Sequence, residues 1–244
     1  MKYGIKIWST NTQLIKSTRK HYEKGDFDYI ELSAIVGSFD KRLIELLKGI
    51  PCVIHCDNKN VNLSLKLENN EKALREAVNF ADELDAKYII IHPGFKGSVN
   101  TINSYIINDT RFCIENMPGI TIDTNQEMLG RTFEELKQIK CNNYCFDYSH
   151  AIKASKTLKI VSKIIIDNLI KLNPKIIHIS DGFKDSEKDE HLSIGEGNFD
   201  INGFLKIIPD NVMITLETQK KNYLDLTEDI KNIKIIKKMI DSVK

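Results

Sequence analysis

The chain has 244 residues, of which 41% are hydrophobic and 28% are charged. This composition is typical of a folded globular protein and excludes a disordered or fibrous chain. Lys and Arg number 35 against 34 Asp and Glu, which gives a formal net charge of +1. A near-neutral chain does not bind nucleic acid through a broadly basic surface, so any phosphate-binding patch must be local.

The five cysteines do not show the spacing of a disulfide framework. Cys52, Cys113 and Cys145 lie in apolar runs, which favours reduced thiols in an intracellular protein. The first residues, Met1 to Trp8, do not resemble a signal peptide, and no run of about 18 apolar residues follows. We therefore expect a cytoplasmic protein with no membrane partner.

Short β-rich runs alternate with stretches of helical spacing along the whole chain. The predicted strands are Tyr3–Trp8, Tyr29–Leu32, Cys52–Cys56, Tyr88–His92, Arg111–Asn116, Asn143–Asp147, Lys175–Ser180 and Val212–Glu217. The predicted helices are a first helix around His21, then Asp40–Leu47, Glu71–Leu84, Thr132–Ile139, Leu158–Leu172 and Leu226–Ile240. Alternation of this kind predicts parallel strands joined by crossover helices.

Eight such units in a chain of this length predict an α/β fold, a single-domain (β/α)8 TIM barrel over residues 1–244. An open doubly wound sheet is the alternative. Such a sheet usually carries a glycine-rich phosphate loop after its first strand, and the segment Trp8-Ser9-Thr10-Asn11 contains no glycine.

The predicted strands end on histidines and carboxylates. In barrels of this class the active site forms at the C-terminal ends of the strands, so these side chains should share one ring. Two residues earlier in each strand, side-chain alternation predicts an inward-facing packed layer. That layer comprises Val53, Ile90, Cys113, Cys145, Ile176 and Thr215, so we interpret the two cysteines as core residues and not as ligands.

Imidazoles and carboxylates without thiolates form the ligand set expected for zinc, manganese or iron in an enzyme. Nine residues are candidates: His55, His92, Glu115, Asp147, His150, His178, Asp189, His191 and Glu217. Any one of them alone could be a hydrogen-bonded or solvated residue. Their shared position at the strand ends favours a metal site for two or three ions.

Several further residues near the strand ends have two interpretations. Glu31 ends its strand at the right place but has no motif around it, and Asp181 fits either a metal shell or a turn. Asp200 is available as a helix N-cap. Four lysines after strand ends could meet a phosphate but are interpreted as solvated surface; these are Lys96, Lys184, Lys220 and Lys221.

Six segments carry short motifs around the candidate ligands: Ile91-His92-Pro93-Gly94, Ile114-Glu115-Asn116, Asp147-Tyr148-Ser149-His150-Ala151, Ile177-His178-Ile179-Ser180-Asp181, Asp189 to Gly197 and Leu216-Glu217-Thr218. These motifs resemble the xylose isomerase-like barrel superfamily and, within it, the endonuclease IV family of abasic-site endonucleases. Each segment is weak alone, but together and in this order they are specific for the superfamily.

The resemblance implies a trinuclear zinc site. Glu115 would bridge two metals, and the first of these would also be bound by His55 and His92. The second metal would also be bound by Asp147, His178 and Glu217, and the third would be bound by His150, Asp189 and His191. Such a site suits cleavage of a phosphodiester, including DNA with an abasic site.

The same superfamily contains sugar and sugar-phosphate isomerases and epimerases. In these relatives one divalent metal, manganese or magnesium, would use Glu115, Asp147, His178 and Glu217, and the pair Glu115 and Glu217 would also move protons. In either enzyme class Glu115 and Glu217 are the predicted catalytic residues. A third hypothesis is a metal-holding or nucleic-acid-binding protein without activity.

One departure from the DNA-cleaving relatives bears on the substrate. Those relatives carry a tyrosine shortly after the strand-three histidine, which wedges into the duplex, whereas here His55 is followed by Cys56-Asp57-Asn58. Extruding a nucleotide from a duplex costs a few kcal/mol and needs such wedging side chains. The sequence therefore supports the metal chemistry more strongly than DNA as the substrate.

Overall fold

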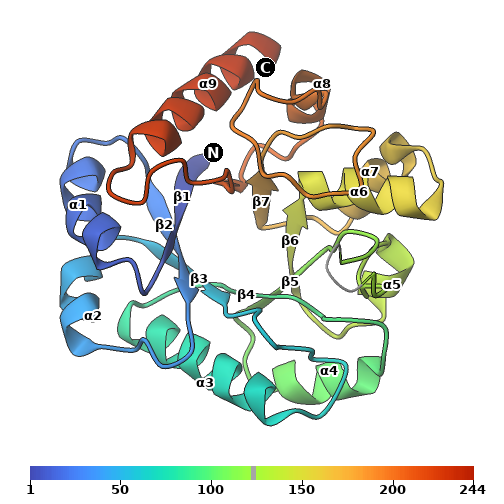
Figure 1. Cartoon of the computed structure of the whole chain (residues 1–244), viewed down its shortest axis with the longest axis horizontal. Helices are drawn as coiled ribbons and strands as arrows, with labels where there is room; N and C mark the ends of the chain where they lie inside the picture. The colour runs from blue at the N-terminus through green and yellow to red at the C-terminus, as the bar shows by residue number, and fades with distance from the viewer. Residues whose placement is uncertain (122–124) are drawn as a thin grey trace.

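Eight parallel strands close into a barrel in the order of the chain in a computed structural model, which describes residues 1–121 and 125–244. The strands are β1 (Lys2–Trp8), β2 (Tyr29–Ala34), β3 (Cys52–Cys56), β4 (Ile89–Ile91), β5 (Phe112–Glu115), β6 (Asn143–Asp147), β7 (Ile176–Ile179) and β8 (Met213–Leu216). Figure 1 looks into the barrel with the helices arranged around it. The predicted TIM barrel is confirmed, and the open doubly wound sheet is not formed.

The helices lie outside the strands and follow the expected β/α order. They are α1 (Thr12–Glu23), α2 (Lys41–Leu47), α3 (Glu68–Glu83), α4 (Val99–Ile106), α5 (Phe133–Lys137), α6 (Tyr148–Leu158), α7 (Ser162–Ile170), α8 (Ile201–Leu205) and α9 (Thr227–Val243). None of the helices within the described ranges combines the length and the apolar composition needed to cross a bilayer.

The helix predicted at Leu158–Leu172 is confirmed as α7, which begins later than expected, at Ser162. The preceding helix α6 ends at Leu158, because Lys159 adopts a left-handed conformation at φ 56°. The sequence pattern missed α4 and α6. Asp200 caps α8 as expected, since its carboxylate accepts the Gly203 N–H at 3.0 Å.

Two separate apolar regions stabilise the barrel. The larger one lies between the strands and the surrounding helices. The smaller one fills the barrel interior and consists of Tyr29, Val53, Ile90, Cys113, Cys145 and Ile176. The predicted inward-facing layer is thus confirmed. Thr215 is also fully buried there, and its hydroxyl lies 2.8 Å from the Tyr29 hydroxyl.

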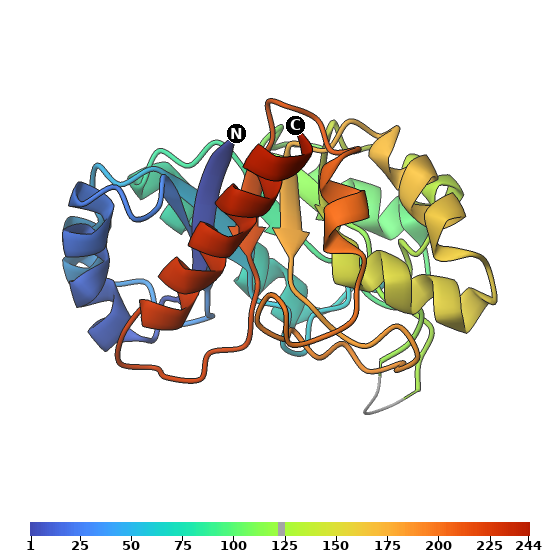
Figure 2. The ribbon, with the colours of Figure 1, turned by 90° about the horizontal axis from the view of Figure 1, so that it is seen from above.

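Long loops surround the end of the barrel toward which the strands point. Figure 2 shows the loops after β7 and after β8 gathered at that end, which lies at the bottom of the view. These loops carry two of the nine candidate ligands, Asp189 and His191. The strand ends and loops together therefore position the candidate site, as the barrel architecture predicts.

Candidate metal centre

The nine candidate ligands meet at the mouth of the barrel. They form three groups whose donor atoms lie within 4.8 Å of one another inside each group. The groups are His55, His92 and Glu115; Glu115, Asp147, His178 and Glu217; and His150, Asp189 and His191. Glu115 belongs to the first two groups, so one carboxylate joins them.

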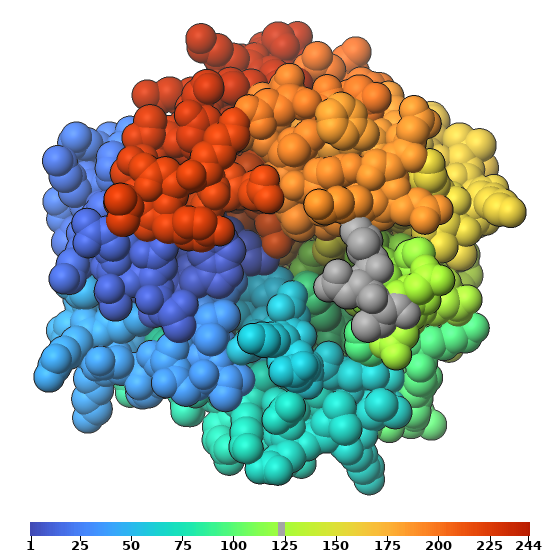
Figure 3. All heavy atoms as spheres, viewed as in Figure 1, coloured from blue at the N-terminus to red at the C-terminus, as the bar shows by residue number. Residues whose placement is uncertain are grey.

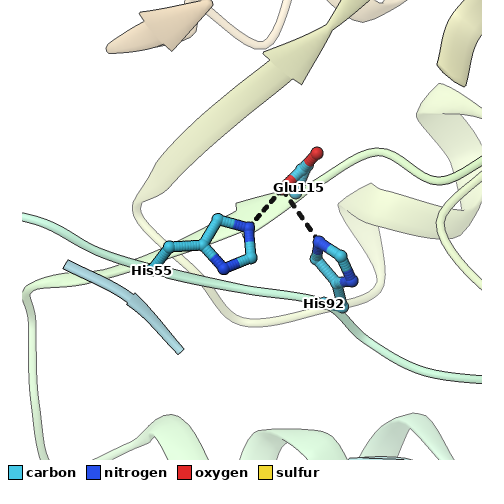
Figure 4. Close-up of side chains that lie close together, drawn as sticks. All are labelled: His55, His92 and Glu115. Carbon is cyan, nitrogen blue, oxygen red and sulfur yellow. Dashed lines mark hydrogen bonds and ion pairs between the residues drawn. The ribbon is translucent and has the colours of Figure 1, made fainter. Parts of the chain in front are cut away.

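The first group connects strands β3, β4 and β5. His55 Nε2 lies 3.3 Å and His92 Nε2 lies 3.1 Å from the same oxygen, Glu115 Oε2. Figure 4 shows both imidazoles directed at this carboxylate. Two atoms bound to one tetrahedral zinc at 2.0–2.2 Å are about 3.4 Å apart, so the spacing suits a shared ion.

The second group contains four buried polar atoms that lack hydrogen bonds. Glu115 Oε1, Asp147 Oδ2, His178 Nδ1 and Glu217 Oε2 are all buried and have no hydrogen-bond partner of good geometry. His178 Nδ1 lies 3.3 Å from the Glu115 atom, 3.8 Å from the Asp147 atom and 2.6 Å from the Glu217 atom. Buried polar atoms are normally satisfied, so four that point at one position fit a cation there.

The third group is built partly by a helix start and partly by a loop. His150 lies in the first turn of α6, and its Nε2 is 3.0 Å from Asp189 Oδ2. His191 Nε2 is 2.8 Å from the same oxygen. Ser149 donates its hydroxyl to Asp189 Oδ1 at 2.5 Å, which fixes the carboxylate between the two imidazoles.

Asp147 uses its two oxygens differently. Its Oδ1 accepts the His150 N–H at 2.6 Å and so caps α6, whereas Oδ2 faces the second group. Asp147 also lies level with His178 on the neighbouring strand. The start of α6 at this position therefore places His150 in the third group while Asp147 remains in the second.

Hydrogen bonds orient most of the imidazoles toward the site. The Nδ1 atoms of His55, His150 and His191 each lie 2.9 Å from a backbone carbonyl oxygen, which leaves Nε2 directed at the carboxylates. His178 has the opposite arrangement, with Nε2 2.8 Å from Glu31 Oε2 and Nδ1 toward the second group. Carbonyl and carboxylate partners of this kind fix the tautomer of metal-ligating histidines.

The carboxylates and imidazoles strongly perturb one another. Burial alone would raise the pKa of Glu115, but His178 and His92 outweigh burial and hold that pKa well below its usual range. Burial would lower the pKa of His150, yet Asp147 and Asp189 raise it well above its usual range. Burial, opposed by His150 and assisted by Asp189, raises the pKa of Asp147 to about 6. A ring so rich in carboxylates requires positive charge, which protonated imidazoles or metal cations supply.

Lys6 and Glu31 complete the ring and were not assigned by the sequence pattern. Lys6 Nζ lies 2.6 Å from Glu217 Oε1 and 3.3 Å from Glu31 Oε1. Burial would lower the Lys6 pKa, but Glu217 and Glu31 raise it, so this lysine is charged. The available signal was a lysine between Ile5 and Ile7 in the middle of a strand, where a charged side chain needs a partner inside the barrel.

The structure decides between the two interpretations of Asp181. Asp181 is a loop anchor, because its carboxylate accepts N–H groups from Gly182, Gly195, Gly197 and Phe199. This anchor shapes the loop that carries Asp189 and His191.

The prediction that Lys220 is solvated was wrong, since its side chain is buried. Lys220 is 7% exposed and forms an ion pair with Asp229.

Cys145 lies close to the second group but keeps the properties of a core residue. Its sulfur is within reach of Glu115 and His178, and burial raises the pKa of its thiol well above the usual value. Because a thiol binds metal as the thiolate, the neutral form favours packing in the barrel interior. All five cysteines are free.

Comparison with known proteins identifies related sequences. A family model described as the xylose isomerase-like TIM barrel matches residues 16–243. An uncharacterized protein of Methanocaldococcus jannaschii is 30% identical over 203 residues, which cover 75% of this chain and 76% of the relative. A protein named probable endonuclease 4 from Mycoplasmopsis pulmonis is 27% identical over 246 residues, covering 89% and 86% of the two chains.

Solved structures with the same fold carry different names. A D-tagatose 3-epimerase-like protein superposes with a TM-score of 0.76 at 23% identity, covering 100% of this chain and 98% of that one. Endonuclease IV from Thermus thermophilus superposes with a TM-score of 0.72 at 18% identity, covering 99% and 100%. At these identities the two likenesses show the shared barrel.

Proposed function

This chain belongs to the xylose isomerase-like TIM barrel family, and from that premise we propose that it is a metal-dependent phosphodiesterase of the endonuclease IV type. The observation that carries the proposal is the presence of three donor groups, two of them joined through Glu115, where one group would suffice for a single metal. Relatives named probable endonuclease 4 support the same class. DNA with an abasic site is the substrate that these names suggest.

The nine candidate ligands would together bind up to three zinc ions. His55, His92 and Glu115 would hold one ion, and Asp147, His178 and Glu217 would hold a second with Glu115. His150, Asp189 and His191 would hold the third. Bound zinc ions supply Lewis acidity, which lowers the pKa of water and neutralises the charge of a phosphodiester.

The chain's own residues position the two predicted catalytic carboxylates. Glu115 is fully buried and divides its oxygens between the first and second groups. Lys6 holds Oε1 of Glu217, so that Oε2 is free to face His178. Because Glu31 holds the far nitrogen of His178, Nδ1 of this imidazole stays directed at the second group.

Metal content tests this proposal directly. Elemental analysis of protein purified without a chelator should find two or three zinc ions per chain, and zinc-loaded protein should hydrolyse a phosphodiester oligonucleotide that contains an abasic site. Chelator-treated protein should be inactive and should recover activity with zinc. One metal per chain, with no cleavage of any phosphodiester tested, would reject the phosphodiesterase.

A sugar or sugar-phosphate isomerase or epimerase is the second candidate. The second group alone provides four donors, and its Glu115 and Glu217 oxygens lie 3.3 and 2.6 Å from His178 Nδ1. Two carboxylates at one metal, manganese or magnesium, could move protons at a carbon next to a carbonyl. Deuterium uptake from solvent into a sugar phosphate, with one metal per chain, would favour this candidate over the first.

A further inference from the structure

A pocket of about 250 Å³ opens beside the candidate metal centre. It lies between the ends of β1 and β8 and the loop after β7, and its wall includes three candidate ligands, Asp189, His191 and Glu217. Figure 3 shows the orange-red loop after β8 directly beside the blue segment that follows β1. A phosphoester bound at the metal centre would therefore extend one of its substituents into this pocket.

Two aromatic rings form the outer wall of the pocket. Trp8 ends β1, and Tyr223 lies in the loop after β8, with their ring centroids 6.1 Å apart and the planes tilted by 50°. Tyr223 is 57% exposed, so one face of its ring is open to a ligand. Asn11 donates its side-chain N–H to the Tyr223 carbonyl at 3.1 Å, which ties the two loops together.

The pocket wall combines lysines with carboxylates. Lys6 and Lys188 both line it, and Lys188 is exposed. An ammonium group has three donors, and among the described residues Lys6 pairs with Glu217 and Glu31. The acidic residues of the wall are already engaged, since Glu190 pairs with Lys153 and Asp189 with His150 and His191. The exposed ammonium group of Lys188 is therefore the cation that can meet an anion, and the outer wall suits a flat ring.

The size of the pocket limits what can enter. Pockets that enclose drug-sized ligands usually measure about 300–1,000 Å³, so a space of about 250 Å³ accepts one ring system and no base pair. Aromatic side chains bind unpaired bases because every base has a π face. The segment after β3 offers no comparable ring, because His55 is followed there by Cys56-Asp57-Asn58.

We propose that this pocket is a subsite for one unpaired nucleobase, stacked on Trp8 and Tyr223, next to the phosphoester that the metal centre receives. The inference rests on the proposed function and narrows its substrate to nucleotide chains whose base beside the cleaved bond is unpaired, as in a single strand or at an extruded position. A sugar phosphate has no flat aromatic ring that could stack on the aromatic wall.

Trp8 is the only tryptophan of the chain, so its fluorescence reports occupancy of the pocket without any need for turnover. Chelator-treated and zinc-loaded protein are titrated with adenosine 5′-monophosphate, ribose 5-phosphate and inorganic phosphate. Adenosine monophosphate should quench Trp8 and bind about 5- to 150-fold more tightly than ribose 5-phosphate, the range expected for one base stacked on an aromatic ring.

Tyr223→Ala should remove most of this preference, as measured by isothermal titration calorimetry. The exposed position of Tyr223 makes loss of the fold unexpected, and Ile107→Ala, a change at an apolar side chain that is 69% exposed at the end of α4, is the matched control. Equal binding of adenosine monophosphate and ribose 5-phosphate, or an unchanged preference in Tyr223→Ala, would overturn the subsite.

The outcome separates the subsite from the proposed function. Cleavage of an abasic phosphodiester without a preference for adenosine monophosphate would reject the subsite and leave the phosphodiesterase intact. Quenching by adenosine monophosphate that is lost in Tyr223→Ala, without cleavage of any phosphodiester, would support a nucleobase site and reject the phosphodiesterase.

Discussion

The two halves of the barrel interior are built by the same strands but differ in chemistry. Toward the N-terminal ends of the strands, Val53, Ile90 and Ile176 belong to a fully buried apolar cluster. Two residues further along, His55, His92 and His178 face carboxylates, and buried polar atoms there lack hydrogen bonds.

This difference indicates that the apolar half stabilises the fold, whereas the polar half carries the candidate metal ligands. An apolar layer that is closely packed contributes to folding directly. Unsatisfied buried polar atoms and crowded carboxylates cost free energy, so the mouth is stable only because the layer beneath it and the surrounding helices compensate. Substitutions in the two halves should therefore have separable effects.

The largest effect is expected from removing a carboxylate at the mouth. Glu115→Gln and Glu217→Gln should each abolish metal-dependent activity and lower the number of bound metals, because a neutral amide is a poor ligand for a divalent cation. Thermal unfolding should stay close to that of the parent protein. Glu68→Gln, at a side chain that is 78% exposed, is the control. Undiminished turnover in both variants would refute the assignment of the site.

A change in the apolar half should instead destabilise the fold. Ile90→Ala should lower the free energy of unfolding by about 2–5 kcal/mol, since a fully buried isoleucine leaves a cavity. Metal content at a temperature where the variant is folded should be unchanged. Urea denaturation and elemental analysis measure the two quantities. If Ile90→Ala loses its metal while remaining folded, the two halves are not independent.

A smaller effect is expected from the residue that orients an imidazole from outside the second group. Glu31→Gln should weaken zinc binding by about 10- to 100-fold, because the carboxylate fixes the tautomer of His178 and increases its basicity. Competition with a chromophoric chelator measures the affinity. Glu45→Gln, at a side chain that is 72% exposed, should leave the affinity unaltered. Parental affinity in Glu31→Gln would show that His178 needs no such support.

The smallest expected effect is a pH dependence of stability and zinc affinity that arises from His191 in the third group. Burial would lower the His191 pKa, but Asp189 raises it to about 9. Because this value exceeds the ordinary value of about 6.5, the protonated imidazole stabilises metal-free protein fully below pH 6.5, and this stabilisation is lost as pH rises through 9. Zinc affinity should increase over the same interval, since zinc displaces the proton.

Thermal unfolding of chelator-treated protein from pH 6 to 9.5 measures the loss of stability, and chelator competition measures the gain in affinity. His191→Gln should flatten both curves. A pH dependence in His191→Gln that matches the parent protein would assign the titration to another group.

Much of the barrel and the ring of histidines and carboxylates at the strand ends could be predicted from local pattern. Side-chain alternation within one strand places Val53 beneath His55 and Ile176 beneath His178, whatever surrounds the strand. The break between α6 and α7 could not be predicted in this way. It depends on a left-handed conformation at Lys159, a residue type that ordinarily continues a helix.

Two buried lysines show the other limit of the sequence, since Lys6 was not assigned and Lys220 was expected to be solvated. Lys6 and Lys220 are identical in type to the many solvated lysines of the chain, and their burial depends on Glu217 and Asp229 reaching them in space. No local pattern specifies such a pairing, because the partner of Lys6 is 211 residues away along the chain.

The sequence by itself determined the barrel and the ring of histidines and carboxylates, because strand period and strand order are written in consecutive residues. Only the tertiary structure decided which donors lie close enough to share a metal ion, that Lys6 holds Glu217, and that Trp8 meets Tyr223 beside the candidate site. The contacts of Lys6 and Trp8 join the first strand to the last, and the closure of the barrel creates them.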